Sequence, residues 1–147
     1  MGAGVVISWN PHNFLLLFDQ TPMGATGYFT HSDCRLHEMG AGHPECPQRL
    51  DAIEDRLLIT GLDHALERRE PSPASLADIE LAHDRMYVAS IRGLSEALIE
   101  DMQAGGPSHT ALDPDTTMNV HTWHAALRSA GAALDAADAV MAGELEN

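Results

Sequence analysis

The stretch His43-Pro44-Glu45-Cys46-Pro47-Gln48-Arg49-Leu50 marks the point where a loop gives way to a helix. Residues 32–46, which include the first four residues of this stretch, are rich in glycine, histidine and proline, a composition typical of loops. Proline is favoured in the first turn of a helix, because its fixed φ suits the turn and its missing N–H would have no partner there. The apolar residues that follow predict a helix with one apolar stripe, which ends at Gly61; the stripe consists of Leu50, Ile53, Leu57 and Leu58.

On both sides of this helix the sequence predicts short strands and further helices. Residues 25–31 and 66–70 have the composition of short strands. Ser75 and Asp78 have the spacing of a capping box for a helix over 76–82, and Asp84 starts a longer one. Residues 103–115 are predicted to be a polar loop, and a last, alanine-rich helix covers 120–142.

This pattern amounts to four helices and at most two short strands. Two short strands cannot form the sheet that such helices usually cover, and an alanine-rich helix needs a close-packed partner. We therefore expect the 147 residues to be incomplete as a self-contained domain and, when alone, to self-associate or be marginally stable, with the alanine-rich face of residues 120–142 as the contact.

Composition excludes several classes of function. The chain carries 22 acidic and 8 basic residues, a net charge of −14, which argues against direct binding of nucleic acid or attachment to a membrane through basic residues. Two cysteines make no disulfide framework, and no signal-peptide pattern opens the chain, so we expect a cytoplasmic protein. Residues 1–24 hold a single charge and no sustained period, which we interpret either as an N-terminal extension ahead of a domain over 25–147 or as a genuine N-terminal strand or arm.

The loop over 31–46 holds most of the residues that could bind a metal. The spacings His31-x2-Cys34 and His43-x2-Cys46 resemble zinc pairs, but no finger pattern is complete. The alternative is that these histidines make local hydrogen bonds or line a cleft. A second candidate is Asp113-Pro114-Asp115, read either as the cap of the last helix or as a carboxylate presented to N–H donors of a ligand.

Several motifs, in order, resemble the histone deacetylase family, best its bacterial amidohydrolase-like members and class II enzymes. The segment quoted first is similar to the family's His-Pro-Glu-x-Pro-x-Arg pattern, and the resemblance extends over residues 25–147. The other matching segments are Tyr28-Phe29-Thr30-His31, His83 with Tyr87-Val88, Leu112-Asp113-Pro114-Asp115-Thr116, and the alanine-rich run from Ala125 to Ala132.

The resemblance implies an α/β fold, the N-terminal part of an arginase/deacetylase-like domain with few strands in this segment. It also implies zinc-dependent hydrolysis of N-acyl amides such as acetyl-lysine or acetylpolyamine. The family's zinc ligands, histidine pair and tyrosine would follow Asn147, so this chain is expected to hold no catalytic residue and no metal ligand.

Three kinds of site residue carry over from the resemblance. Asp115 matches a position at the pocket rim that grips the substrate backbone, and Arg49 with Pro47 matches the inner channel. His31, His37 and His43 then belong to a pocket-rim loop. Two other classes remain open: a truncated, non-catalytic homologue that acts as a binding or oligomerisation module, and a helical protein with a local metal site.

Overall fold

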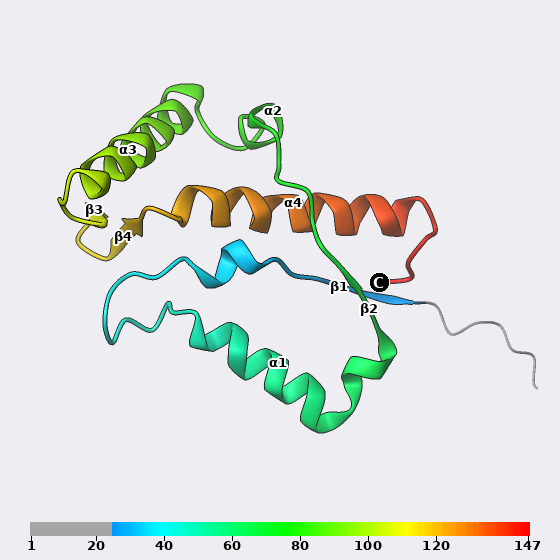
Figure 1. The fold of residues 1–147 in the computed structure, drawn as a ribbon. Helices are drawn as coiled ribbons and strands as arrows, with labels where there is room; N and C mark the ends of the chain where they lie inside the picture. The colour runs from blue at the N-terminus through cyan, green and yellow to red at the C-terminus, as the bar shows by residue number, and fades with distance from the viewer. Residues whose placement is uncertain (1–24) are drawn as a thin grey trace, which may run out of the picture.

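The computed structural model describes residues 25–147, so the predicted extension over 1–24 lies outside the described part. Strands β1 (Thr26–Phe29) and β2 (Leu66–Arg69) pair in parallel, with Thr26 opposite Leu66. Helix α1 (Gln48–Thr60) connects them, as a parallel pair requires a crossover. Both predicted strands and the helix after Pro47 are confirmed, and β1 and β2 lie between α1 and α4 (Figure 1).

The local signals at the helix ends act as predicted. Gly61 ends α1 at φ +73°, a conformation that side chains with a Cβ rarely adopt. A short 3-10 turn (Leu62–Ala65) then leads into β2. Helix α2 (Leu76–Ile79) is shorter than expected but carries the full Ser75–Asp78 capping box. Asp84 caps helix α3 (Arg85–Gln103) by accepting the N–H groups of Met86 and Tyr87.

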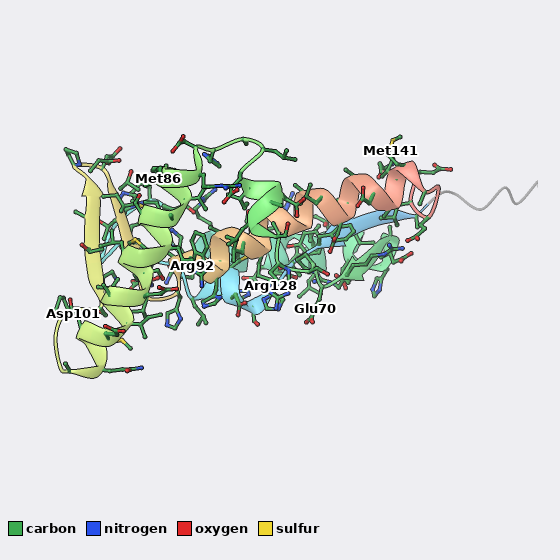
Figure 2. All side chains as sticks on the ribbon, turned by 90° about the horizontal axis from the view of Figure 1, so that it is seen from above. Glu70, Met86, Arg92, Asp101, Arg128 and Met141 are labelled. Carbon is green, nitrogen blue, oxygen red and sulfur yellow. The ribbon has the colours of Figure 1, made fainter. Side chains whose placement is uncertain are left out.

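The prediction of a polar loop over 103–115 is wrong. Strands β3 (His109–Asp113) and β4 (Thr116–Asn119) form an antiparallel hairpin that packs beside α3, as Figures 1 and 2 show. Met118 of β4 and the following Val120 join Leu98 in a buried cluster. The two strands have little of the apolar alternation of an ordinary strand, which is why their sequence does not predict them. Asp115 consequently lies in the turn of the hairpin and does not cap a helix.

Helix α4 (Thr122–Met141) finds its close-packed partner in a backbone segment of the same chain. The carbonyl oxygen of Ser72 approaches Gly131 so closely that an added Cβ would lie 1.8 Å from it. The Ala74 N–H donates to the Leu127 carbonyl at 3.0 Å, and Asp135 accepts the Ser72 N–H at 2.7 Å. Three small residues of α4 therefore serve packing inside the chain, since Ala125, Gly131 and Ala139 are buried.

The last residues lie along the edge of β1 that faces away from β2. Glu146 N–H donates to the Ala25 carbonyl at 3.0 Å, and Gly27 N–H donates to the Asn147 carbonyl at 2.8 Å. Leu145 is only 4% exposed and occupies the space above Gly27, where an added Cβ would lie 2.5 Å from its Cδ1. The chain end and β1 thus lie together at the end of the molecule opposite the hairpin (Figure 1). Among the described helices, none combines the length and the apolar character needed to cross a membrane.

Candidate functional site

Two cavities lie on either side of the loop that precedes α1. The hairpin-side cavity has a volume of about 680 Å³ and lies between this loop, the end of α3 and the hairpin. The sheet-side cavity has a volume of about 530 Å³ and lies between β1, α1 and α4. Cys46 lines both, so the loop is the wall between them.

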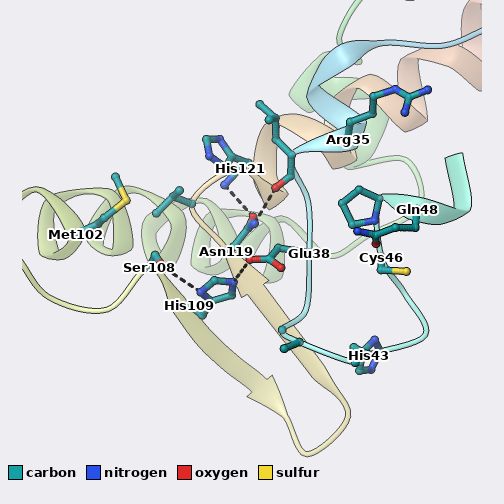
Figure 3. Close-up of a pocket in the computed structure, with 16 residues that line it drawn as sticks. Arg35, Glu38, His43, Cys46, Gln48, Met102, Ser108, His109, Asn119 and His121 are labelled. Carbon is teal, nitrogen blue, oxygen red and sulfur yellow. Dashed lines mark hydrogen bonds and ion pairs between the residues drawn. The ribbon is translucent and has the colours of Figure 1, made fainter. Parts of the chain in front are cut away.

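Polar contacts between the loop and the hairpin close one wall of the hairpin-side cavity (Figure 3). Oε1 of Glu38 lies 3.1 Å from Nε2 of His109, whose Nδ1 lies 2.9 Å from the Ser108 hydroxyl. Gly40 and Gly42 line the same cavity with φ of +108° and +81°, a backbone conformation that favours glycine. The loop therefore reaches the hairpin because glycines allow its turn and Glu38 anchors it.

Two arginines and two histidines line the sheet-side cavity. Arg49 projects from α1 and forms an ion pair with Glu45, while the Arg128 Nε donates to Asp33 at 3.3 Å. His31 and His37 come from the loop side of the same cavity. The wall thus carries two guanidinium groups, which suit a carboxylate because they can donate two parallel hydrogen bonds to it.

The cysteine and histidine pairs of the loop make local hydrogen bonds. The Nδ1 atoms of His31 and His43 accept the N–H groups of Asp33 and Glu45, at 3.1 and 3.0 Å. The thiol of Cys34 lies 3.8 Å from the Ala125 carbonyl, and burial, aided by the Asp33 charge, raises its pKa. Within residues 25–147 no three His, Cys, Asp or Glu side chains gather in a way that would hold a metal ion.

The site residues predicted from the sequence are divided among three places. His31, His37 and Arg49 lie together in the sheet-side cavity. Pro47 and His43 line the hairpin-side cavity, so Pro47 and Arg49 do not share one channel wall in this structure. Asp115 is exposed in the hairpin turn and lines neither of these two cavities.

Asn119 is a site residue that reasoning from the sequence missed. It is 4% exposed, and its Nδ2 donates to the Leu36 carbonyl at 2.8 Å, which ties the loop to the end of β4. Its Oδ1 accepts the His121 N–H at 3.0 Å. An asparagine three residues before a helix is a usual turn-forming signal, which could have identified it.

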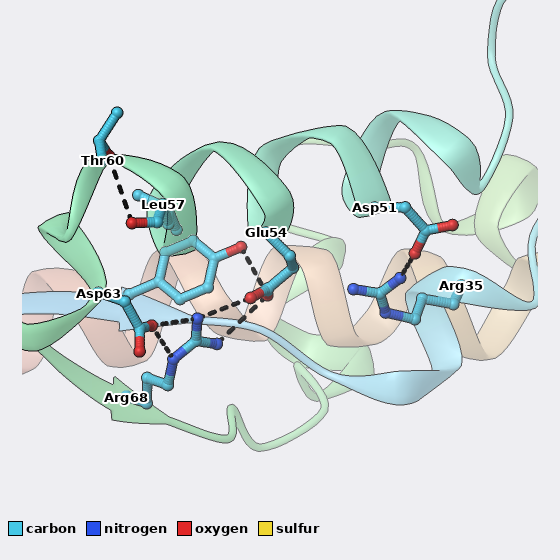
Figure 4. A network of polar contacts seen from close by, with 8 residues as sticks. Arg35, Asp51, Glu54, Leu57, Thr60, Asp63 and Arg68 are labelled. Atoms are coloured by element: carbon cyan, nitrogen blue, oxygen red, sulfur yellow. Dashed lines mark hydrogen bonds and ion pairs between the residues drawn. The ribbon is translucent and has the colours of Figure 1, made fainter.

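A network of charged and aromatic side chains holds α1 against the sheet (Figure 4). The Arg68 guanidinium in β2 donates to Glu54 at 2.6 Å and to Asp63 at 2.5 Å, and it lies 5.0 Å from the ring centre of Tyr28. The Tyr28 hydroxyl donates to Glu54 at 3.1 Å. Hydrogen bonding by Arg68 lowers the pKa of Glu54 in spite of its desolvation, whereas burial raises the pKa of Tyr28. The network fixes the helix from which Arg49 projects.

These elements define an α/β protein with few strands, and its fold matches that of a deacetylase domain. The crystal structure of the HDA15 HD domain superposes with a TM-score of 0.69 at 22% identity, covering 84% of this chain and 33% of that one. A family model described as the histone deacetylase domain matches residues 43–147. The chain therefore belongs to the histone deacetylase family, and the resemblance seen in its motifs is confirmed.

Its relatives include bacterial, archaeal and human proteins. It is 35% identical over 107 residues to the histone deacetylase-like amidohydrolase of Pseudomonas aeruginosa, covering 73% of this chain and 26% of the relative. It is 31% identical over 126 residues to the polyamine deacetylase HDAC10 of Homo sapiens, covering 83% and 18%. A protein of Archaeoglobus fulgidus named "Probable deacetylase" is 32% identical over 124 residues, covering 83% and 32%. The chain thus spans less than a third of the length of each of these relatives.

Proposed function

We propose that this chain forms the N-terminal part of a zinc-dependent deacetylase that hydrolyses N-acyl amides such as acetyl-lysine or acetylpolyamine. The observation that carries the proposal is the match of the deacetylase domain over residues 43–147, which contains the His-Pro-Glu-x-Pro-x-Arg segment. Relatives named as polyamine deacetylases support the substrate class. The described residues do not provide a ligand set for zinc, so we assign this chain no step at the metal.

The role of this chain is to hold the substrate and to receive the acid product. Asp115 is exposed at the tip of the hairpin, where an ionised carboxylate can accept N–H groups of an acylated substrate. Asp113 has a different task, because its Oδ1 accepts the Asp115 N–H at 2.8 Å and so shapes the turn. Hydrolysis of an N-acyl amide releases a carboxylic acid, for which Arg49 in the sheet-side cavity is a suitable partner.

The rim loop joins these two regions. His43 belongs to the wall of the hairpin-side cavity, while His31 and His37 face the sheet-side cavity. We assign all three to the rim of the pocket: His31 and His43 accept hydrogen bonds within the loop, and His37 contacts Thr122.

The proposal is tested by reading the gene beyond Asn147 and assaying its whole product. An in-frame R-P-P-G-H-H segment, and chelator-sensitive hydrolysis of an acetyl-lysine peptide or an acetylpolyamine, are the expected results. We predict that purified residues 1–147 alone do not hydrolyse either substrate, because we assign the zinc ligands and the histidine pair to the chain beyond Asn147. Zinc-dependent turnover by the purified 147-residue chain, or a whole product inactive on every N-acyl amide offered, would contradict the proposal.

A non-catalytic binding module is the second candidate. Its support is the apolar surface at the end of α1, where Leu58, Ile59 and Leu62 are 61%, 78% and 55% exposed. Large exposed apolar side chains in one place are typical of interaction surfaces. A stop codon directly after Asn147, with a stable complex of this chain and a partner protein, would favour this function over the enzyme.

A further inference from the structure

The orientation of the Asn119 side chain follows from its backbone partners. One side-chain atom accepts the His121 N–H at 3.0 Å and must be the carbonyl oxygen Oδ1. The other donates to the Leu36 carbonyl at 2.8 Å and must be Nδ2. The amide is therefore oriented by two backbone groups and cannot be reversed without breaking both hydrogen bonds.

The Thr122 hydroxyl stands between this amide and His37. Its Oγ1 accepts the Asn119 N–H at 2.8 Å, lies 3.1 Å from Asn119 Oδ1 and lies 2.9 Å from His37 Nδ1. A hydroxyl has one proton to donate and two lone pairs to accept with. All three contacts are satisfied when the hydroxyl donates to Oδ1 and accepts a proton from His37 Nδ1.

The opposite arrangement is unfavourable. If the Thr122 hydroxyl donated to His37 Nδ1, its oxygen would face the Asn119 Oδ1 at 3.1 Å without a proton between them. Two acceptor oxygens facing each other in a partly buried place repel and leave a hydrogen bond unmade, which costs free energy. The network thus selects one tautomer of His37.

We propose that Asn119 and Thr122 are positioning residues that hold neutral His37 as its Nδ1–H tautomer, so that Nε2 accepts a hydrogen bond from a ligand in the sheet-side cavity. His37, Thr122, Arg49 and Arg128 all line that cavity. The ligand class that uses both kinds of group is a small molecule with an acceptor oxygen for a guanidinium and an O–H or N–H donor for Nε2. A primary amide and a protonated carboxylic acid are such molecules. Only the identity of the ligand rests on the proposed function, since amide hydrolysis would release a small carboxylic acid.

The tautomer is measurable without any turnover. The 147-residue chain, labelled with 15N in histidine, is studied by long-range 1H–15N correlation at a pH where its histidines are neutral, and His37→Gln identifies the His37 signals. The expected result is a protonated Nδ1 and an unprotonated Nε2. A protonated Nε2 in the wild-type chain would overturn the inference, and it would leave the proposed deacetylase function untouched.

Two variants of Thr122 separate positioning from a general structural effect. Thr122→Val keeps the shape and removes the hydroxyl, so His37 is expected to move toward the Nε2–H tautomer that free histidine prefers. Thr122→Ser keeps the hydroxyl and is expected to keep the wild-type tautomer. Equal tautomer populations in the valine and serine variants would contradict positioning by the hydroxyl, and if the valine variant does not fold, the serine variant and the wild-type chain still decide the tautomer.

Acetamide is the probe for the ligand class. Added to the wild-type chain, acetamide is expected to shift the His37 Nε2 signal in the direction seen when a ring nitrogen accepts a hydrogen bond. The shift is expected to be smaller in Thr122→Val. Arg49→Gln, which removes the guanidinium, is expected to weaken the response while the His37 tautomer stays the same. An unchanged Nε2 signal at high acetamide concentration in the wild-type chain would refute the ligand assignment.

Discussion

At the scale of single residues, the two aspartates of the hairpin turn have different environments. Asp113 accepts the N–H of Asp115, and this bond, aided by Thr116, lowers the pKa of Asp113, while the Asp115 carboxylate is exposed. The two aspartates therefore have different roles: Asp113 stabilises the turn, and Asp115 remains available to a ligand.

This division predicts different effects of Asp115→Asn and Asp113→Asn in the whole enzyme. Asp115→Asn should raise the activation free energy that sets kcat/KM by about 1.5–3 kcal/mol, because a charge-assisted hydrogen bond is about twice as strong as a neutral one. This corresponds to a roughly tenfold to hundredfold lower kcat/KM. Asp113→Asn should act mainly on stability, with a lower melting temperature and a much smaller kinetic effect. Steady-state kinetics and thermal melts of both variants make the comparison, and unchanged kinetics for Asp115→Asn would show that Asp115 does not bind substrate.

Two helical glycines provide a second test at this scale. Gly131 faces the Ser72 carbonyl, so Gly131→Ala should destabilise the chain by about 1–3 kcal/mol or more, because the obstacle is backbone and cannot rotate away. Gly93 in α3 meets nothing within 4 Å, so Gly93→Ala should stabilise it by about 0.5–1 kcal/mol. Urea unfolding of the two variants measures the change in the free energy of unfolding, which should be opposite in sign for the two. Equal changes would mean that segment 71–74 does not pack on α4 in solution.

At the scale of elements, the contact between α1 and the sheet depends on an ionised Glu54. Its pKa is lowered in the folded chain, mainly by the Arg68 hydrogen bond, from an ordinary value of 4.5. A group with a lower pKa in the folded state stabilises it above the unfolded pKa, and this contribution is lost as the pH falls through the folded pKa. We therefore expect the stability of the wild-type chain to fall at pH values below about 4.5.

Glu54→Gln should reduce stability at neutral pH and make it less dependent on pH in the acid range. Asp78 and Asp113 also have lowered pKa values, so some acid sensitivity should remain in the variant. Glu96→Gln is the matched control: its pair with Arg92 lies on the exposed face of α3, and such pairs contribute only about 0.3–0.5 kcal/mol. Melting temperatures across the acid range measure this, and parallel curves for the wild-type chain and Glu54→Gln would contradict it.

At the scale of the whole molecule, the apolar surface of the isolated chain predicts self-association. The sequence places the contact on the alanine-rich helix α4, where Ala125, Gly131 and Ala139 are buried within the chain, whereas Ala133, Leu134 and Ala137 are exposed. We place the contact at the end of α1, where Leu58 and Ile59 are 61% and 78% exposed. Sedimentation velocity should show concentration-dependent association of residues 1–147.

Ile59→Glu should shift this association toward monomer, because a charged side chain cannot be buried cheaply in an apolar contact. Met141→Glu, at the exposed end of α4, is the matched control and should change the association much less. A wild-type chain that sediments as a stable monomer at all concentrations, or equal effects of the two variants, would rule out the α1 surface as the contact.

The sequence by itself determined the features that depend on neighbouring residues. The helix after Pro47, its end at Gly61, the Ser75–Asp78 capping box and the two short strands were all predictable, because caps, turns and periodicity act over a few residues. The family was also predictable, since an ordered set of short motifs survives in the linear sequence.

Only the tertiary structure decided which groups share a cavity and which segments pack together. The hairpin over 109–119 has little apolar alternation of its own, so its strands form because they pair with each other and pack on Leu98. Likewise, Arg49 lines the same cavity as His37 but a different one from Pro47, because residues two positions apart at the start of a helix do not face the same side. Thr122 contacts His37 from 85 residues away and Asn119 contacts Leu36 from 83 residues away, separations over which only the folded chain brings these groups together.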